Sequence, residues 1–202
     1  MDYKPLKNLI LASLLSRGEV FKKKGDSTKQ LIVPLIYENR YFLADYLKEF
    51  ELQHYVKIDS ESNEMTIYLT VEYIDLVDHW HDNSEKIFKK NFLKSTDIQA
   101  IILCLNLFGV RQVEGIAFST TIKQAYLFTL SYTLKSLLNV NVIFSKNQLK
   151  ITDVSKLLLE VIGKTSSKNS SYIAAYLNSK EKEKLIESTN IIQSKLGEDT
   201  YV

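Results

Sequence analysis

An internal duplication constrains the fold of this chain more than any other feature. The sequence predicts the same order of elements twice: a helix ended by glycine, a hairpin, a helix, a second hairpin and a third helix. The glycines that end the two opening helices, Gly18 and Gly109, lie 91 residues apart. Two hairpins per copy favour a four-stranded antiparallel sheet in each half. We therefore expect an α+β protein with two halves related by a pseudo-twofold axis, whose opening helices pack on each other.

Hydrophobic periodicity and turn residues give the expected elements of each copy. In the first copy they are a helix at 6–17, strands at 19–23 and 30–36, a helix at 39–50, strands at 53–58 and 65–70, and a helix at 71–80. In the second copy they are a helix from 96 or 97 to 107, a hairpin within 110–120, a long helix at about 121–138, strands at 140–145 and 148–152, and a helix at 154–162.

The remaining segments connect or extend these copies. Residues 81–95 predict a polar, basic connection, and a Ser/Lys/Asn-rich linker at 163–171 leads to an appended C-terminal helix at roughly 180–196. The predicted divisions are 1–80 for the first repeat, 81–95 for the connection, 96–165 for the second repeat, and 166–202 for the linker and C-terminal helix. Two repeats in one chain predict a monomer that is itself a pseudo-dimer.

Composition excludes several other classes of protein. With 45% hydrophobic and 25% charged residues, the 202-residue chain is typical of a soluble globular protein rather than a disordered or fibrous one. A single cysteine, Cys104, excludes an internal disulfide and a cysteine-cluster zinc site. The longest apolar stretch, 98–110, is too short to cross a bilayer, and the N-terminus lacks the features of a signal or transit peptide. We expect no membrane partner.

Residue usage also bears on the source and the partners. Lysine supplies 23 of the 26 basic residues, and there are only six glycines and two prolines. This bias is typical of an AT-rich genome and favours an organelle, a mitochondrion rather than a chloroplast, with the cytoplasm as the alternative. The net charge of +2 neither requires nor forbids a nucleic-acid partner, so the distribution of charge has to decide.

The opening helices carry the residues that resemble a known family. The segments ILASLLSRG, ending at Gly18, and IILCLNLFG, ending at Gly109, are each followed by a strand, and IAFSTT at 116–121 leads toward a helix. In this pattern the chain resembles the LAGLIDADG homing endonuclease family in its two-repeat, single-chain form, over about residues 6–165. The resemblance implies that the two motif helices pack at the pseudo-twofold axis above a saddle of strands that contacts nucleic acid.

The resemblance also implies one catalytic acid immediately before each motif glycine, where it binds Mg²⁺ for phosphodiester cleavage. These positions hold Arg17 and Phe108 instead, and neither side chain is an oxygen ligand of the kind that Mg²⁺ prefers. Glu19 is a displaced acid that an active enzyme could use. We predict that the protein is not a nuclease and has no metal or other cofactor. The run His79–Asp82 predicts a helix end with a buried Trp80 rather than a metal site.

Basic segments supply the predicted nucleic-acid site. Lysines cluster at the first hairpin tip and in the connection, interleaved with Phe21, Phe88 and Phe92, and aromatic and basic residues together are typical of a nucleic-acid surface. The predicted contacts are Lys22, Lys23, Lys24, Lys29, Lys86, Lys89, Lys90, Lys94 and Arg111.

The leading hypothesis is a non-catalytic nucleic-acid-binding protein whose target is structured RNA rather than DNA. Two settings fit it: an organellar ribosome, where it would contact ribosomal RNA, and a group I intron, where it would act as a splicing factor. Ribosomal or other ribonucleoprotein neighbours would then be partners, and the appended helix could dock on one of them. Two alternatives stay open: an active Mg²⁺-dependent DNA endonuclease, and a protein-interaction module that does not touch nucleic acid.

Overall fold

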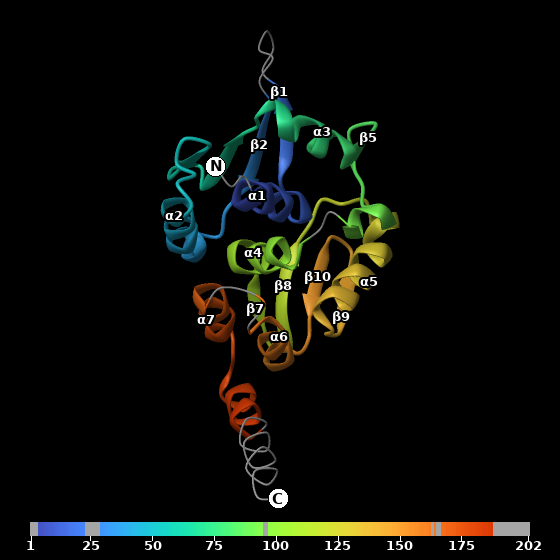
Figure 1. The fold of residues 1–202 in the computed structure, drawn as a ribbon. Helices are drawn as coiled ribbons and strands as arrows, with labels where there is room; N and C mark the ends of the chain where they lie inside the picture. Colours follow the sequence, from blue (N-terminus) through green and yellow to red (C-terminus); the bar gives the residue numbers. More distant parts are fainter. Residues whose placement is uncertain (1–3, 23–28, 95–96, 163, 165–166, 188–202) are drawn as a thin grey trace, which may run out of the picture.

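A computed structural model describes residues 4–22, 29–94, 97–162, 164 and 167–187 (Figure 1). It contains helices and two four-stranded antiparallel sheets, one in each half of the chain, which confirms the expected α+β class. No helix within these ranges is long and apolar enough to cross a membrane.

The first half follows the order expected from the sequence. Its elements are α1 (Lys4–Leu15), β1 (Glu19–Lys22), β2 (Lys29–Pro34), the 3₁₀ helix η1 (Tyr37–Asn39), α2 (Arg40–Glu49), β3 (Val56–Asp59), β4 (Glu64–Tyr68) and α3 (Val71–His79). The strands pair in the order β1-β2-β4-β3. Leu31, Val33, Met65 and Ile67 are buried on one face of this sheet, while the alternate residues Gln30, Ile32, Thr66 and Tyr68 lie on the other.

The second half repeats this topology. Its elements are α4 (Ile98–Phe108), β7 (Val110–Gln112), β8 (Gly115–Ser119), η3 (Gln124–Tyr126), α5 (Leu127–Leu138), β9 (Val142–Ser145), β10 (Gln148–Ile151) and α6 (Val154–Val161). The strand order is β7-β8-β10-β9, the same arrangement as in the first sheet. Between the halves lie a short hairpin, β5 (His81–Asp82) with β6 (Glu85–Lys86), and η2 (Lys90–Lys94).

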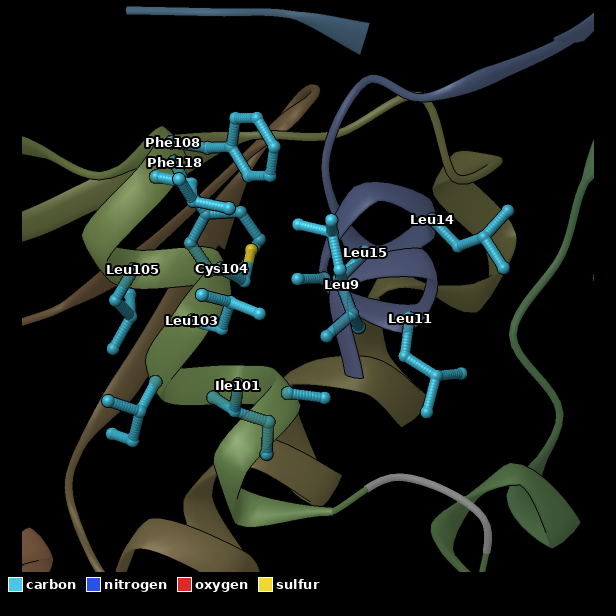
Figure 2. Close-up of a cluster of buried hydrophobic side chains, with 14 of the residues drawn as sticks. Leu9, Leu11, Leu14, Leu15, Ile101, Leu103, Cys104, Leu105, Phe108 and Phe118 are labelled. Atoms are coloured by element: carbon cyan, nitrogen blue, oxygen red, sulfur yellow. The ribbon is translucent and has the colours of Figure 1, made fainter. Parts of the chain in front are cut away.

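The two opening helices pack on each other at the centre of the molecule (Figure 1). Figure 2 shows Leu9 and Leu15 of α1 facing Cys104 and Phe108 of α4. Every residue from Leu9 to Ser16 is buried, because α1 has its own sheet on one side and α4 on the other. Such helices are apolar around most of their circumference, which explains why the motif segments contain so few charges.

Each opening helix ends where its glycine lets the chain turn closely back. At Gly109, an added Cβ would lie 2.3 Å from the Leu105 carbonyl oxygen and 2.9 Å from Ile116 Cγ2. At Gly18, it would lie 2.6 Å from the Ser13 carbonyl oxygen. Since Cβ atoms do not tolerate such distances, both positions require glycine, and this explains the repeated stop that first indicated the duplication.

The connection between the repeats is less polar than its sequence predicted. Trp80 is fully buried, as expected, and it packs on Phe88 and Phe92 with ring centroids 5.5 and 5.2 Å away. Phe88 and Phe92 were expected to interleave with lysines on the surface, but they are 0% and 6% exposed. That prediction is wrong, because these two rings and Trp80 form a small aromatic core beneath the connection.

Two boundaries also differ from the sequence predictions. The long helix expected at about 121–138 begins at Leu127, because Thr121 and Lys123 instead use their backbone N–H groups to bond the carbonyl oxygens of Ser16 and Lys86. The segment expected to be a polar linker contains helix α7 (Ser167–Ala175). A further helical segment begins at 179 and is described up to 187; the rest of the predicted C-terminal helix lies outside the described residues.

Candidate nucleic-acid interface and the ends of the motif helices

The ends of α1 and α4 meet at a small pocket on the boundary between the two halves. The pocket has a volume of about 160 Å³, and residues of both repeats line it. Arg17 and Phe108, which occupy the positions of the family's catalytic acids, both lie in this lining, with Pro34, Val110, Ser119 and Gln148 among the other residues. The structure therefore places these two positions in one pocket.

Each helix end is capped by the opposite repeat. The Ser16 carbonyl oxygen accepts a hydrogen bond from the backbone N–H of Thr121 at 3.2 Å. At the equivalent place in the second repeat, the Leu107 carbonyl oxygen accepts one from Asn39 Nδ2 at 3.1 Å. Ser16 and Leu107 each lie two residues before a motif glycine, so the two acceptors are pseudo-twofold counterparts, whereas the donors lie at different positions of their repeats. These bonds satisfy carbonyl groups that a helix end otherwise leaves without a partner.

A buried lysine also lies at the end of α1. Lys86, in β6, is 3% exposed, and its Nζ donates hydrogen bonds to the carbonyl oxygens of Ser16 at 2.9 Å and Gly18 at 2.8 Å. Burial lowers the pKa of Lys86 to about 8, and the carboxylate of Glu19 partly opposes this effect. The negative end of the helix dipole stabilises a cation here. Lys86 was predicted to contact nucleic acid from the surface; that prediction is wrong.

A tyrosine from the C-terminal region lies at the end of α4. The hydroxyl group of Tyr176 is 3.0 Å from the Gly109 carbonyl oxygen and 3.3 Å from that of Leu105. Burial raises the pKa of Tyr176 above its ordinary value, which keeps the hydroxyl protonated and able to donate. Sequence analysis missed this residue, because the motif pattern contains nothing that identifies a partner about 70 residues away.

The residues at these helix ends do not fit a divalent metal ion. Mg²⁺ prefers oxygen ligands, and carboxylates above all, whereas the two positions before the glycines carry a guanidinium and a phenyl ring. At the end of α1, the Lys86 ammonium group already donates hydrogen bonds to the carbonyl oxygens of Ser16 and Gly18. Across the described ranges, no group of three or more His, Cys, Asp or Glu side chains could hold a metal ion.

The sheets present outer faces of different charge. We define the outer face as the side of each sheet opposite the buried residues. In the first sheet it carries Glu19, Asp59 and Glu64 against one lysine, Lys57. Exposed Phe21 and Tyr68 lie on the same face, at 53% and 40% exposure. In the second sheet, the one charged residue among the paired strand residues of this face is Lys150, whose Nζ lies 3.0 Å from Glu114 Oε2.

The basic residues predicted to contact nucleic acid divide into three groups. Lys22, Lys89 and Lys90 are exposed, as the prediction requires. Lys29 and Arg111 are engaged in ion pairs: Lys29 Nζ lies 2.6 Å from both carboxylate oxygens of Asp78, and Arg111 bonds Glu181 at 3.0 Å. Lys23, Lys24 and the side chain of Lys94 lie outside what the structure describes. The described members of this set therefore do not form one continuous surface with Arg111.

The fold has known counterparts. The homing endonuclease I-WcaI, solved bound to its DNA recognition sequence, matches with a TM-score of 0.57 at 14% identity, over 84% of this chain and 86% of that one. A variant of the homing endonuclease I-DmoI, solved with its target DNA and manganese, matches with a TM-score of 0.51 at 13% identity, over 84% of this chain and 98% of that one.

Comparison by sequence adds no relative: no protein-family model matches the chain, and no curated protein does. In this chain, the two halves each have the same strand order and a central helix ended by glycine. The fold expected from the motif segments is confirmed: this chain has the LAGLIDADG homing endonuclease fold.

Proposed function

We propose that this protein binds nucleic acid without cutting it, and that its target is structured RNA in an organellar ribosome or a group I intron complex. The observation that carries the proposal is that Arg17 and Phe108 lie at the motif helix ends and that Lys86 bonds the carbonyl oxygens there. The fold itself supports nucleic-acid binding, since the two matched homing endonucleases were solved in complex with DNA.

The helix ends support the non-catalytic part of the proposal. Metal-dependent phosphodiester cleavage needs carboxylates that hold a cation beside the reacting phosphate. Arg17 and Phe108 supply none, and the Lys86 ammonium group would repel a divalent ion from the carbonyl oxygens of Ser16 and Gly18. The same ammonium group provides hydrogen-bond donors for carbonyl oxygens at the end of α1, so this end of the central helix pair needs no metal ion.

Shape rather than sequence would determine which RNA is bound. The second sheet's outer face has few charged groups, and the exposed lysines at 22, 89 and 90 lie outside it. Lysine–phosphate contacts position a protein on a helix, whereas base contacts specify sequence. A protein that relies on scattered lysines is suited to recognising the form of a folded RNA.

A gel-shift titration of the full chain tests binding. We expect affinity for a structured RNA to fall steeply with salt, and the variant with Lys22, Lys23 and Lys24 replaced by alanine to flatten the salt dependence by about one unit of slope for each lost phosphate contact. Lys48→Ala and Lys156→Ala, which remove exposed lysines of α2 and α6, are the matched controls. Absence of binding below micromolar concentration would contradict the proposal.

A cleavage assay tests the non-catalytic part. Plasmid DNA incubated with the protein and Mg²⁺ or Mn²⁺ should stay intact. Nicking that Glu19→Gln abolishes would show instead that the displaced acid supports an active endonuclease.

One observation favours a second candidate, in which the protein binds another protein. The outer face of the first sheet has three acids to one lysine, together with exposed Phe21 and Tyr68. Acidic residues repel phosphates, while exposed aromatic rings are common at protein interfaces. Recovery of one protein partner after nuclease treatment, reduced by Phe21→Ser, would favour this candidate over RNA binding.

A further inference from the structure

Each half of the molecule has an aromatic groove beside the edge strand of its sheet. The second groove, of about 460 Å³, lies between α5 and β9, and Phe128, Tyr132, Lys135 and Phe144 are in its lining. The first groove, of about 350 Å³, lies between the η1–α2 segment and the end of β3, with Tyr37, Arg40, Tyr41 and Ile58 in its lining. In Figure 1, α5 runs beside β9 at the side of the second sheet.

The two grooves are counterparts under the pseudo-twofold symmetry. Each lies between the second helix of its repeat and the edge strand, and Tyr41 and Phe128 are both the second residue of that helix, α2 or α5. The rings of Tyr37, Tyr41, Phe128 and Tyr132 are 61–78% exposed, whereas aromatic side chains ordinarily contribute large buried areas. Each groove thus has an exposed pair of aromatic rings four residues apart, a surface feature that the core does not explain.

Charge distinguishes the second groove from the first. Residues 115–152, which form most of the second half, contain four lysines and no aspartate or glutamate. Lys123 and Lys150 pair with Glu85 and Glu114, but within the described ranges Lys135 makes no salt bridge. In the first groove, the guanidinium of Arg40 is held over the Tyr37 ring, 4.8 Å from its centroid, and bonds Asn63.

We infer that the second groove binds an unpaired segment of nucleic acid, with bases stacked on Phe128 and Tyr132 and a phosphate near Lys135. This inference rests on the proposed function and deepens it. It places unpaired nucleotides of the bound nucleic acid in a site beside the sheets rather than on their outer faces. Exposed rings beside a lysine are complementary to a planar base attached to an anionic chain. A groove without acidic groups imposes no repulsion on that chain.

Binding of a short oligonucleotide tests the site directly. A fluorescein-labelled oligouridylate of about 12 nucleotides is titrated with the full chain, and anisotropy reports the affinity. We expect Phe128→Ala and Tyr132→Ala each to weaken binding about tenfold, since base stacking on one ring accounts for that order of effect. Tyr132→Phe keeps the ring and should bind like the wild type. Ile162→Ala, which truncates another exposed apolar side chain, is the control.

A folded RNA hairpin without a single-stranded tail separates this inference from the proposed function. Two results would overturn the groove inference and leave the proposed function standing. In the first, the wild type binds the hairpin but not the oligouridylate. In the second, the Phe128→Ala/Tyr132→Ala double variant binds the oligouridylate within about twofold of the wild type. If the wild type binds oligouridylate alone and the double variant does not, the groove stands and structured RNA is not the target. Loss of a protein partner from the double variant, with oligouridylate binding unchanged, assigns the groove to protein and overturns the inference.

Discussion

The buried ammonium group of Lys86 should make folding stability depend on pH in a definite direction. Burial lowers the pKa of Lys86 from 10.5 to about 8, while lysine in the unfolded chain keeps its ordinary pKa. Between these two values the unfolded state binds more protons than the folded state, so the free energy of unfolding rises with pH. Lys86 therefore lowers the free energy of unfolding at neutral pH, and this effect disappears as the pH rises above the pKa of lysine in the unfolded chain.

The size of the effect follows from the same shift. A pKa lowered from 10.5 to about 8 corresponds to a cost of about 3 kcal/mol for burying the charged form at pH 7. At pH 10 the unfolded lysine has itself begun to lose its proton, and the remaining cost is about 1 kcal/mol. The free energy of unfolding should therefore gain about 2 kcal/mol from Lys86 between pH 7 and pH 10.

Urea unfolding of the wild type and the Lys86→Met variant, followed by far-ultraviolet circular dichroism, measures this gain. Methionine keeps an unbranched side chain but cannot titrate, so the difference between the two proteins isolates Lys86 from the tyrosines, which both contain. Burial raises the pKa of the neighbouring Cys104 thiol, which therefore stays protonated in the folded state of both. The wild-type value minus the variant value should increase by about 2 kcal/mol from pH 7 to pH 10.

Two results would refute this reasoning. A constant difference across the range would mean that the carbonyl oxygens of Ser16 and Gly18, with the helix dipole, fully offset the desolvation of the ammonium group. A difference that decreases with pH would mean that these partners stabilise the charged form more than water does, and that the pKa of Lys86 is raised rather than lowered.

Three further experiments test contacts at the end of α4 and just beyond it. Gly109→Ala should destabilise the protein by about 3 kcal/mol, because its Cβ would meet the Leu105 carbonyl oxygen at 2.3 Å; an unchanged melting temperature would contradict the close approach. Tyr176→Phe removes the hydroxyl that bonds Gly109 and should cost about 1 kcal/mol in urea unfolding, whereas no cost would show that water replaces it. A double-mutant cycle on Arg111→Ala and Glu181→Ala should give a coupling of about 1 kcal/mol, and zero coupling would mean that the ion pair does not hold the C-terminal segment.

The fold was predictable because two local signals repeat at one spacing. Gly18 and Gly109 are required by close backbone contacts, and the hydrophobic periods of the flanking helices and strands come from burial on one face. Helix boundaries were less predictable. The start of α5 moved because Thr121 bonds Ser16, a residue of the other repeat, and no local propensity encodes such a bond.

The candidate site was only partly predictable, for a related reason. Arg17 and Phe108 were found from the motif alone, because each comes immediately before a motif glycine. Lys86 has the same sequence signature as its exposed neighbours Lys89 and Lys90. What buries it is a pair of carbonyl oxygens about 70 residues earlier, together with an aromatic core beneath the connection. A lysine whose partners are backbone atoms leaves no pattern of complementary charges in the sequence.

The buried lysine also limits what substitutions at the motif positions could do. Position 17 lies between Ser16 and Gly18, the two residues whose carbonyl oxygens hold the Lys86 ammonium group. The side chain at position 17 is exposed in the pocket lining, whereas the Lys86 ammonium group is buried against the two carbonyl oxygens. A carboxylate introduced at position 17 would leave those bonds of Lys86 in place. The carbonyl oxygens of Ser16 and Gly18 would therefore become available to a divalent ion only if Lys86 were replaced as well.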